Sequence, residues 1–274
     1  MTKYALLDFD GFICKAWFAS KSKHRTEYTP PETILRNLVR EAINKATRYF
    51  NSEVTTYLFV SGHTYKKDLY PTYKATREKD EDMQLFRDAM ISEYDAIKSE
   101  QLEADDLISI CISAMDESED YITFSDDKDL RDISEQVCKI NVNSEVEELG
   151  LDGFYINLLC RLLAGDKEDN VTGIPKVGMS TALKLLDTFP SIRNTFEIYK
   201  SKNISIDEAL KQVTLIAPVI REWNEYPADV FYTGRNILDE GELDENIITE
   251  IIIGQVTFLS KLAMEVYLDE NKKN

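Results

Sequence analysis

The sequence is poor in the residues that build zinc sites. Its two histidines, His24 and His63, are isolated from each other, so they are too few to form a zinc site. The four cysteines show no CxxC spacing, and each lies among apolar neighbours, which is typical of reduced core residues. These cysteines are Cys14, Cys111, Cys138 and Cys160.

Long apolar runs and an excess of positive charge are also missing. No apolar run approaches the roughly 20 residues needed to cross a membrane, and the run that follows Lys3 is too short for a signal-peptide core. We therefore expect a cytoplasmic protein without a membrane partner. The net charge of −18 argues against a general nucleic-acid coat, because such proteins bind phosphates through Lys and Arg. It is compatible with an enzyme whose basic groups are concentrated in one region.

The rest of the composition indicates a folded protein with a large core. Of its 274 residues, 43% are hydrophobic and 10% are aromatic, which suits one large globular domain or two modest ones. Strands are predicted at 4–7, 54–60, 121–124 and 137–142, and helices at 31–50, 81–97, 103–115, 151–164 and 256–268. This alternation predicts a parallel sheet covered by helices. After Gly165 the pattern is mainly helical, and the acidic tract 239–246 is predicted to be a surface loop.

Carboxylates occur in four groups beside sequence that is predicted to be buried. Asp8 closes the first strand, and Asp127 and Asp129 follow the strand at 121–124; parallel strands bring such ends to one edge of a sheet. Buried like charges repel one another unless a cation lies among them, and a hard divalent metal is one solution. The eight acids are Asp8, Glu103, Asp105, Asp106, Asp127, Asp129, Asp166 and Asp169. The pattern favours a metal enzyme that acts on phosphate esters over a merely solvated acidic surface.

Residues 63–79 form the most basic stretch of the chain, with five Lys or Arg against two acids. Lys74 and Arg77 are three apart, so on a helix they share a face and are candidates for gripping a phosphate in the transition state. Tyr73 is a candidate for stacking on a nucleobase. Two further candidate phosphate contacts are Lys66 and Lys67. The alternative interpretation of this stretch is an ordinary amphipathic surface helix.

A glycine-bounded turn at 173–178 precedes a predicted helix. Gly173 and Gly178 let the backbone approach a phosphate closely, and the helix start offers free N–H groups. Lys176 and Ser180 are candidate contacts in the same element. The alternative is a simple helical hairpin. We identify no base-reading side chains in this turn or in the basic stretch, so recognition of nucleic-acid shape and ends is predicted.

Five segments, in this order, resemble the 5′-nuclease superfamily. It includes flap endonucleases, the nuclease domain of bacterial DNA polymerase I, and phage 5′-exonucleases, some of them called RNase H. The last segment is the most specific, because it joins an acid pair to a helix–three-turn–helix element. The segments are LLDFDGFICKAWFA (6–19), YPTYKATR (70–77), LEADDLI (102–108), SDDKDL (125–130) and LLAGDKEDNVTGIPKVGMSTALKLL (162–186). Residues 195–274 add little to the resemblance.

The resemblance implies two divalent metal positions, with Mg²⁺ as the ion and Mn²⁺ as a substitute. The implied ligands are Asp8, Glu103, Asp105 and Asp106 for the first position, and Asp127, Asp129, Asp166 and Asp169 for the second, looser one. The implied catalytic residues are Asp8, Lys15, Lys74 and Arg77; the alternative for Lys15 is a simple ion pair with an acid. The basic stretch begins an arch at about 63–100, and the 173–178 turn grips duplex DNA with the help of a monovalent cation.

The sequence departs from this family at one position. Family members place an Asp after the second strand, where Ser61 or Gly62 stands here. Water or Asp10 is the expected replacement, and the departure bears on the affinity of the first metal. Asp10 is otherwise interpreted as a loop or cap residue, because Asp8 is the acid that places Lys15 in register with the family's Arg.

We therefore expect an α/β, PIN-like parallel sheet covered by helices, with a mainly helical C-terminal part that contains the helix–three-turn–helix element. The metal-dependent core is placed at 1–165 and the DNA-binding part at 166–274. The expected activity is a 5′→3′ exonuclease and flap endonuclease for RNA primer removal in replication.

The expected substrates are DNA with a 5′ flap or 5′ end and RNA/DNA hybrids. A single-strand-binding protein or sliding clamp is an expected partner of a monomeric, phage-type enzyme in the host cytoplasm. Two alternatives stay open at this point. One is a structure-specific flap or duplex DNA-binding protein with weak catalysis, and the other is a PIN-type ribonuclease.

Overall fold

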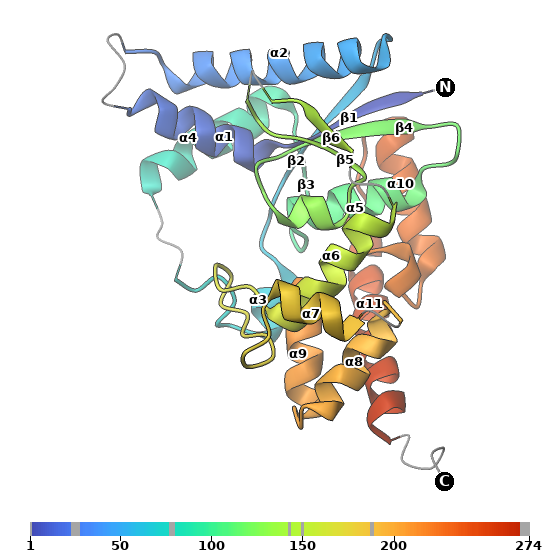
Figure 1. Ribbon diagram of the computed structural model, residues 1–274. Helices are drawn as coiled ribbons and strands as arrows, with labels where there is room; N and C mark the ends of the chain where they lie inside the picture. The colour runs from blue at the N-terminus through green and yellow to red at the C-terminus, as the bar shows by residue number, and fades with distance from the viewer. Residues whose placement is uncertain are drawn as a thin grey trace.

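A six-stranded, mostly parallel sheet forms the centre of one part of the molecule (Figure 1). The computed structural model describes residues 2–22, 28–76, 80–141, 144–148, 151–186 and 189–268. The strands are β1 (Lys3–Asp8), β2 (Thr55–Val60), β3 (Ile97–Lys98), β4 (Asp120–Phe124), β5 (Gln136–Cys138) and β6 (Val146–Glu148). Their spatial order is β3-β2-β1-β4-β5-β6, and among them the β5–β6 pair is antiparallel while the other pairs are parallel.

Helices cover both faces of the sheet and build the second part of the molecule. They are α1 (Phe9–Ser20), α2 (Pro31–Phe50), α3 (Tyr65–Leu69), α4 (Glu81–Tyr94), α5 (Ala104–Ala114), α6 (Leu151–Ala164), α7 (Met179–Leu186), α8 (Ile192–Ser201), α9 (Ile206–Ile216), α10 (Pro227–Glu240) and α11 (Glu245–Leu268). Two short 3₁₀ helices are η1 (Asp129–Asp132) and η2 (Arg221–Trp223).

The central strand β1 separates two apolar cores, because successive side chains of a strand point to opposite faces. Ala5 and Leu7 pack with residues of α1, α2 and α4 on one face. Tyr4 and Leu6 pack with residues of α5, α10 and α11 on the other. In Figure 1, α2 lies across the upper side of the sheet, whereas α5 and α10 lie below it. All four of these β1 residues are buried, as expected for a central parallel strand.

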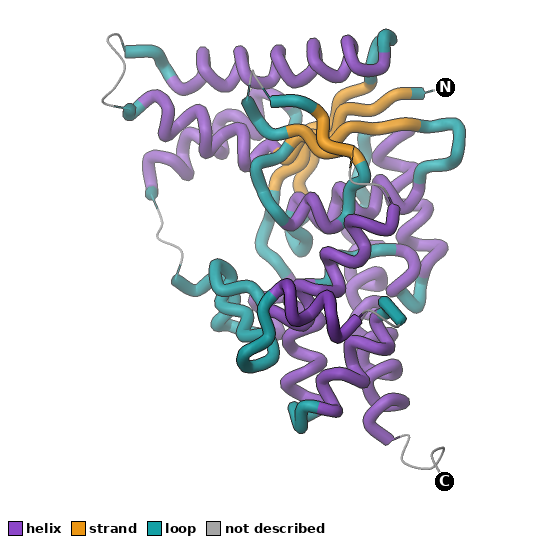
Figure 2. Tube along the Cα trace, in the orientation of Figure 1, coloured by secondary structure: helices purple, strands orange, loops and turns teal. Residues whose placement is uncertain are grey.

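A third apolar core holds the helical part together. It contains residues of α6, α7, α8 and α9 and the second half of α11, and Figure 2 shows this lower part built only of helices and loops. Helix α11 joins the two parts, because Ile248 and Ile251 belong to the sheet core whereas Leu259 and Ala263 belong to the helical core. By length and composition alone α11 is also apolar enough to cross a membrane; its buried face packs as that of a core helix does.

The α/β fold with a helical C-terminal part is confirmed. Helices α2 and α6 have the predicted bounds, and the strand at 4–7 lies within β1. Gly165 ends α6 in the left-handed conformation, with φ of 78°, as a helix stop requires. The four cysteines, all within the described residues, form no disulfide.

Several local predictions are wrong. Residues 97–98 form β3 and do not continue the preceding helix, which ends at Tyr94. The predicted loop at 239–246 is too long, because α10 continues to Glu240 and α11 already begins at Glu245, which leaves residues 241–244 as the loop. The strand predicted at 137–142 ends at Cys138, and residues 142–143 lie outside the described residues. The final helix begins eleven residues before 256, at Glu245.

Candidate active site

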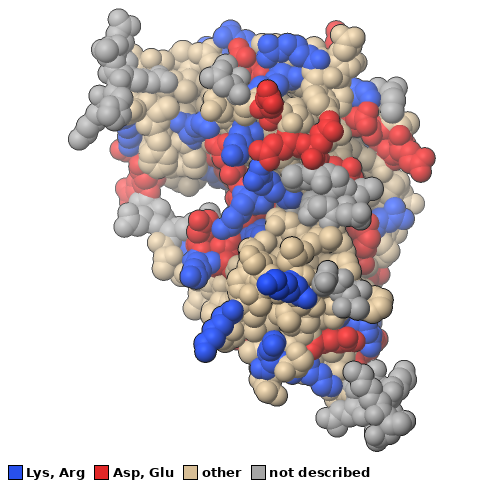
Figure 3. Space-filling view, in the orientation of Figure 1, with Lys and Arg blue, Asp and Glu red and all other residues tan. Residues whose placement is uncertain are grey.

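A cavity of about 790 Å³ lies at the carboxyl ends of β1 and β2, the place where open α/β sheets gather their ligands. Residues of α1 and α4 line it, together with the segment 71–75 and the start of α5. Figure 3 shows a hollow between the sheet part and the helical part, with acidic and basic side chains gathered beside it. The charged lining residues are Asp8, Asp10, Lys67, Lys74, Arg87, Glu103, Asp105 and Asp127.

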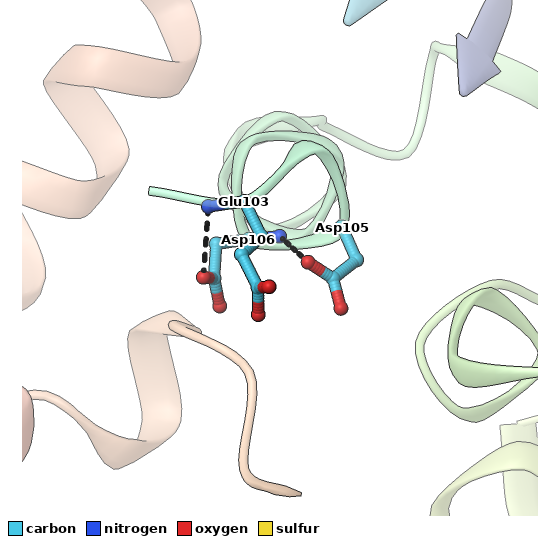
Figure 4. A group of neighbouring side chains, drawn as sticks. All are labelled: Glu103, Asp105 and Asp106. Carbon is cyan, nitrogen blue, oxygen red and sulfur yellow. Dashed lines mark hydrogen bonds between the residues drawn. The ribbon is translucent and has the colours of Figure 1, made fainter. Parts of the chain in front are cut away.

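The start of α5 carries three carboxyl groups, from Glu103, Asp105 and Asp106, which we name the first acid cluster. Each offers an oxygen within 4.8 Å of the others, and Figure 4 shows them projecting to the same side of the helix start. Glu103 directly precedes the helix, and its N–H donates to the Asp106 carboxylate at 3.3 Å. This reciprocal arrangement of an acid before the helix and one three residues later is a helix-start pattern.

Two lysines neutralise part of the first acid cluster. The ammonium of Lys66 is only 2% exposed and lies 3.3 Å from Glu103 Oε2 and 3.6 Å from Asp106 Oδ1. The ammonium of Lys74 lies 2.6 Å from Glu103 Oε1. Burial alone would raise the pKa of Glu103, but the charges of Lys66 and Lys74 hold that pKa at about 2. Glu103 is therefore ionised at neutral pH.

The two aspartates of the first acid cluster have different surroundings. Asp106 is fully buried, and its carboxylate accepts hydrogen bonds from the N–H groups of Glu103 and Val219. Asp105 instead lines the cavity. Burial, and then the neighbouring charge of Asp106, raises the pKa of Asp105 well above its usual range, although Lys66 opposes the rise. Asp106 thus anchors the helix start, and Asp105 and Glu103 are the members that face the cavity.

Asp8 lies at the same cavity but outside the first acid cluster. It ends β1 and caps α1, accepting hydrogen bonds from the Gly11 N–H at 3.3 Å and from the Ser125 hydroxyl at 2.6 Å. Its side chain is buried, and burial raises the pKa of Asp8 to about 7. The charges of Asp10 and Asp127 add to this rise, and the Ser125 hydrogen bond opposes it.

Asp129, Asp166 and Asp169 form a second acid cluster, again with oxygens within 4.8 Å of one another. Asp129 begins η1, and the other two lie in the loop that follows α6. This loop is closed by two backbone hydrogen bonds between Asp166 and Val171, at 2.8 and 2.6 Å. Asp127, the fourth acid predicted for this site, is exposed to the cavity and accepts a hydrogen bond from the Asp129 N–H at 2.9 Å.

Arg161 and Lys128 provide positive charge in the second acid cluster. The Nη2 atom of Arg161 lies 2.7 Å from Asp129 Oδ1 and 2.7 Å from Asp166 Oδ2. The ammonium of Lys128 lies 3.1 Å from Asp166 and 2.8 Å from Glu168. Burial pulls the pKa of Asp166 upward, but hydrogen bonds from Lys128 and the Glu168 N–H, with the charge of Arg161, hold it below its usual value.

Ser61, at the position where the family places an Asp, has a structural role here. Its hydroxyl accepts a hydrogen bond from the Ala104 N–H at 3.1 Å, and its own N–H donates to Asp10 at 2.7 Å. Asp10 also accepts two hydrogen bonds from Arg87 of α4, at 2.6 and 3.3 Å, and Arg87 donates to the Ser61 carbonyl. Asp10 is therefore a bridge between three segments, and it also lines the cavity.

The basic stretch does not form the predicted helix around Lys74. Residues 71–76 are turns, and Lys74 has a left-handed φ of 51°. Arg77 lies outside the described residues. Lys67 lines the cavity, whereas Lys15, placed beside the reaction by the resemblance, pairs with Asp126 at 2.7 Å on the surface.

Tyr73 and Lys66 are placed differently from the sequence-based expectation. The ring of Tyr73 is 3% exposed and packs with Val171 and Leu215, so it presents no free face to a base. Its hydroxyl donates a hydrogen bond that is shared between the carboxylates of Glu103, at 3.0 Å, and Asp169, at 3.3 Å. Tyr73 therefore links the two acid clusters. Lys66 is likewise buried among acids, so its ammonium is not at the surface for a phosphate to reach.

The two glycines of the 173–178 turn differ in what surrounds them. A Cβ on Gly173 would lie 2.1 Å from the carbonyl carbon of Ala164, so this glycine is needed for close packing of two backbones. A Cβ on Gly178 would have no atom within 4 Å. Lys176, with a left-handed φ of 65°, and Ser180 are both exposed beside it. The predicted contact residues of the turn therefore share an open surface, except for Gly173.

Sequence reasoning missed the basic partners of the acids. Arg87, Lys128 and Arg161 were not singled out, and each contacts an acid at the site. For Arg161 one signal was available, because a lone Arg in the apolar run LLCRLLA needs a partner for its charge. Arg87 lies in a polar helix, where nothing distinguishes it from a solvated surface residue.

A family model and two sequence relatives each match most of the chain. A family model described as the 5′-3′ exonuclease, N-terminal resolvase-like domain, matches residues 3–155. A 5′-3′ exonuclease of Mycoplasmopsis pulmonis is 30% identical over 228 residues, which is 77% of this chain and 74% of that protein. DNA polymerase I of Geobacillus stearothermophilus is 25% identical over 300 residues, covering 99% of this chain but only 33% of the polymerase.

Solved structures show the same fold at lower identity. The T5 D15 protein co-crystallised with metal ions has a TM-score of 0.61 at 13% identity, covering 96% of this chain and 98% of that one. A product-like complex of the bacteriophage T5 D15 flap endonuclease with DNA and metal ions has a TM-score of 0.59 at 12% identity, covering 97% and 100%.

Proposed function

This chain belongs to the 5′-3′ exonuclease family and is a phosphodiester-hydrolysing 5′ nuclease, and we propose that it acts on 5′ ends and flaps with divalent metals held at the two acid clusters. The observation that carries this proposal is the pair of acid clusters, which the Tyr73 hydroxyl links; Tyr73 and two members of the first acid cluster line the cavity. The comparisons give no support to a DNA-binding protein without catalysis or to a PIN-type ribonuclease.

The donor set fits hard cations, because the two clusters offer carboxylate oxygens and no thiolate or imidazole among their described members. We propose Mg²⁺ at two positions, with Mn²⁺ as a substitute. The proposed ligands, direct or through water, are Asp8, Glu103, Asp105 and Asp106 for one position, and Asp127, Asp129, Asp166 and Asp169 for the other. When bound, such ions activate a water and stabilise the charge on the leaving oxygen.

The side chains of the protein orient the reacting strand. Lys74 lies at the cavity wall, 2.6 Å from Glu103, where its ammonium can meet a non-bridging phosphate oxygen and offset its growing charge. The Tyr73 hydroxyl fixes the Glu103 carboxylate, so that ligand and lysine keep their relative positions. Lys67 supplies a further charge at the cavity wall, and Arg77 is assigned a similar role by the family resemblance.

The exposed face of the 173–178 turn is the proposed contact for duplex DNA. Gly178 directly precedes α7, and the space around it allows a phosphate to reach the free N–H groups at the helix start. Lys176 and Ser180 flank this point. We assign the monovalent cation to the same turn, and phosphate contacts of this kind recognise shape without reading bases.

The proposed substrates are DNA with a 5′ flap or 5′ end and RNA/DNA hybrids, as primer removal in replication requires. The flap endonuclease of T5 has been crystallised with DNA and metal ions, which supports this assignment. We further propose that the protein works as a cytoplasmic monomer, together with a single-strand-binding protein or a sliding clamp.

The test is cleavage of a 5′-flap duplex labelled at each strand end, with Mg²⁺ and with EDTA. We expect Mg²⁺-dependent cleavage near the junction or stepwise from the 5′ end. Binding without cleavage in both Mg²⁺ and Mn²⁺ would instead indicate a binding protein. Cleavage of unstructured RNA with no preference for a 5′ junction would indicate a PIN-type ribonuclease.

A further inference from the structure

A buried guanidinium lies inside the second acid cluster. Arg161 is on the last turn of α6 and is 7% exposed. One of its nitrogen atoms, Nη2, lies 2.7 Å from an oxygen of Asp129 and 2.7 Å from an oxygen of Asp166. Arg161 therefore bridges two acids from separate elements, which is the task that a divalent cation performs in a metal site.

The space beside this guanidinium is too small for a hydrated metal ion. A cavity of about 10 Å³ lies against Arg161, Asp105 and Asp129, and this volume holds about one water molecule. Mg²⁺ usually keeps several of its own waters. A divalent ion in direct contact with the bridged oxygens would also be repelled by the positive charge of Arg161 at close range.

From this geometry we propose that Arg161 is a built-in counter-ion that keeps divalent-metal binding at the second acid cluster weak. A metal reaches the bridged oxygens of Asp129 and Asp166 only when the guanidinium leaves them. Lys128, on the exposed side of Asp166, adds to the same effect. The inference rests on the proposed function, since it concerns the same metal centre, but it makes a separate statement about affinity.

The experiment measures Mn²⁺ binding to the full chain in the absence of nucleic acid. Electron paramagnetic resonance and calorimetry both report the number of ions bound and their dissociation constants. In Arg161→Gln we expect the dissociation constant of the weaker of the two Mn²⁺ sites to fall at least about tenfold, because a positive charge next to the ion is removed. Arg193→Gln is the matched control, since Arg193 pairs with Glu265 on the surface, and it should bind Mn²⁺ as the wild type does. Adding Asp169→Asn to Arg161→Gln should abolish the gain.

Stability provides a second readout. Arg161→Gln leaves buried acids without their bridge, so it should melt at a lower temperature than the wild type in EDTA and gain more from Mn²⁺. Should it fold only with Mn²⁺, that result supports the proposal as well. Arg161→Lys keeps a positive charge on a more flexible side chain with fewer N–H donors, and it should show an intermediate gain in affinity. Wild-type Mn²⁺ affinity in both variants would overturn the proposal.

The two proposals fail in different ways. A wild-type protein that cleaves flaps while its Arg161 variants bind Mn²⁺ unchanged would leave the nuclease function standing and remove the counter-ion role. If the wild-type protein does not cleave flaps but its Arg161→Gln variant binds the second Mn²⁺ more tightly, the nuclease proposal falls and the counter-ion role stands.

Discussion

Each acid in the first acid cluster has different neighbours, which gives it a different role. Glu103 is held ionised by two lysines, Asp106 is bonded to backbone N–H groups, and Asp105 lines the cavity with a raised pKa. A raised pKa in a buried carboxyl group reports a place where a negative charge is poorly compensated. Asp105 combines a raised pKa with a place at the cavity wall, so a cation bound in the cavity would stabilise its carboxylate directly.

The variant Asp105→Asn should lower Mg²⁺-dependent flap cleavage more than about a hundredfold. The reason is that loss of a proposed metal ligand exceeds the usual effect of losing a residue that only supports a ligand. Flap binding should persist, since no proposed DNA contact is removed. The measurement is single-turnover cleavage together with a gel-shift assay in Ca²⁺. Asp116→Asn, in the exposed loop before β4, should behave as the wild type. Normal cleavage by Asp105→Asn would exclude Asp105 as a ligand.

Most of the acids could be found from sequence, but their basic partners could not. The acids stand next to strand ends and a helix start, which local patterns reveal. The buried position of Lys66 depends on α3 packing against α5, more than thirty residues away in the chain, and no local pattern encodes that contact. For this reason the sequence predicts a surface phosphate contact at Lys66, where the structure has a buried ion pair.

At the scale of elements, one ion pair fixes α4 beside the cavity. Arg87 of α4 binds Asp10 through two nitrogens and also donates to the Ser61 carbonyl. It thereby ties α4 to the start of α1 and to the end of β2. Since α4 forms one wall of the cavity, this contact also sets the width of the opening.

Arg87→Gln should therefore loosen α4. We expect faster amide hydrogen exchange along α4 and a loss of about 2 kcal/mol in the free energy of unfolding, because a bidentate, partly buried charged pair is lost. Arg36→Gln is the matched control, since Arg36 also reaches α4 through Glu93 but as an exposed pair at 3.6 Å. Equal exchange in the two variants would contradict the anchoring role.

The 173–178 turn supports a paired prediction. Gly173→Ala should destabilise the protein by more than about 2 kcal/mol, because its new methyl group would meet the Ala164 backbone. Gly178→Ala has free space and should change stability by less than about 0.5 kcal/mol, while weakening duplex binding. Urea unfolding and gel-shift titration separate the two effects. Wild-type duplex affinity in Gly178→Ala would remove the turn from the interface.

The elements that sequence predicted best are long and strongly periodic. Helix α2 shows apolar residues at helical spacing and begins with Pro31, so its bounds were found. Strand β3 has two residues, too few to show any periodicity, and depends on pairing with β2. Lys74 adopts a left-handed φ, which an α-helix does not contain, so the helical spacing considered for Lys74 from sequence does not apply.

At the scale of the whole molecule, buried tyrosines make the fold sensitive to alkali. Burial is the main cause that raises the pKa of Tyr4 to about 12 and that of Tyr121 to about 12. An unfolded chain loses these protons near pH 10, so it binds fewer protons than the folded chain between about pH 10 and 12. The contribution of these tyrosines to the free energy of unfolding should therefore be constant below pH 10 and fall between about pH 10 and 12.

For each such tyrosine the fall should be about 1.4 kcal/mol per pH unit. Urea unfolding between pH 8 and pH 11.5 measures it. Tyr4→Phe should be less stable than the wild type at pH 8, because it loses the hydrogen bond to Glu119, and this deficit should shrink above pH 10. Tyr232→Phe, at a ring that is 66% exposed, is the control. A Tyr4→Phe deficit independent of pH would contradict the assignment.

The lysines and arginines among the acids also bear on the life of the protein in the cell. Because Lys66, Lys74 and Arg161 already balance much of the buried negative charge, a newly made chain can complete its folding before it meets a divalent ion. Metal supply then regulates how many molecules are active, while the amount of folded protein stays constant. A shortage of the divalent metal would leave a reserve of folded, silent enzyme that restored metal can switch on without new synthesis.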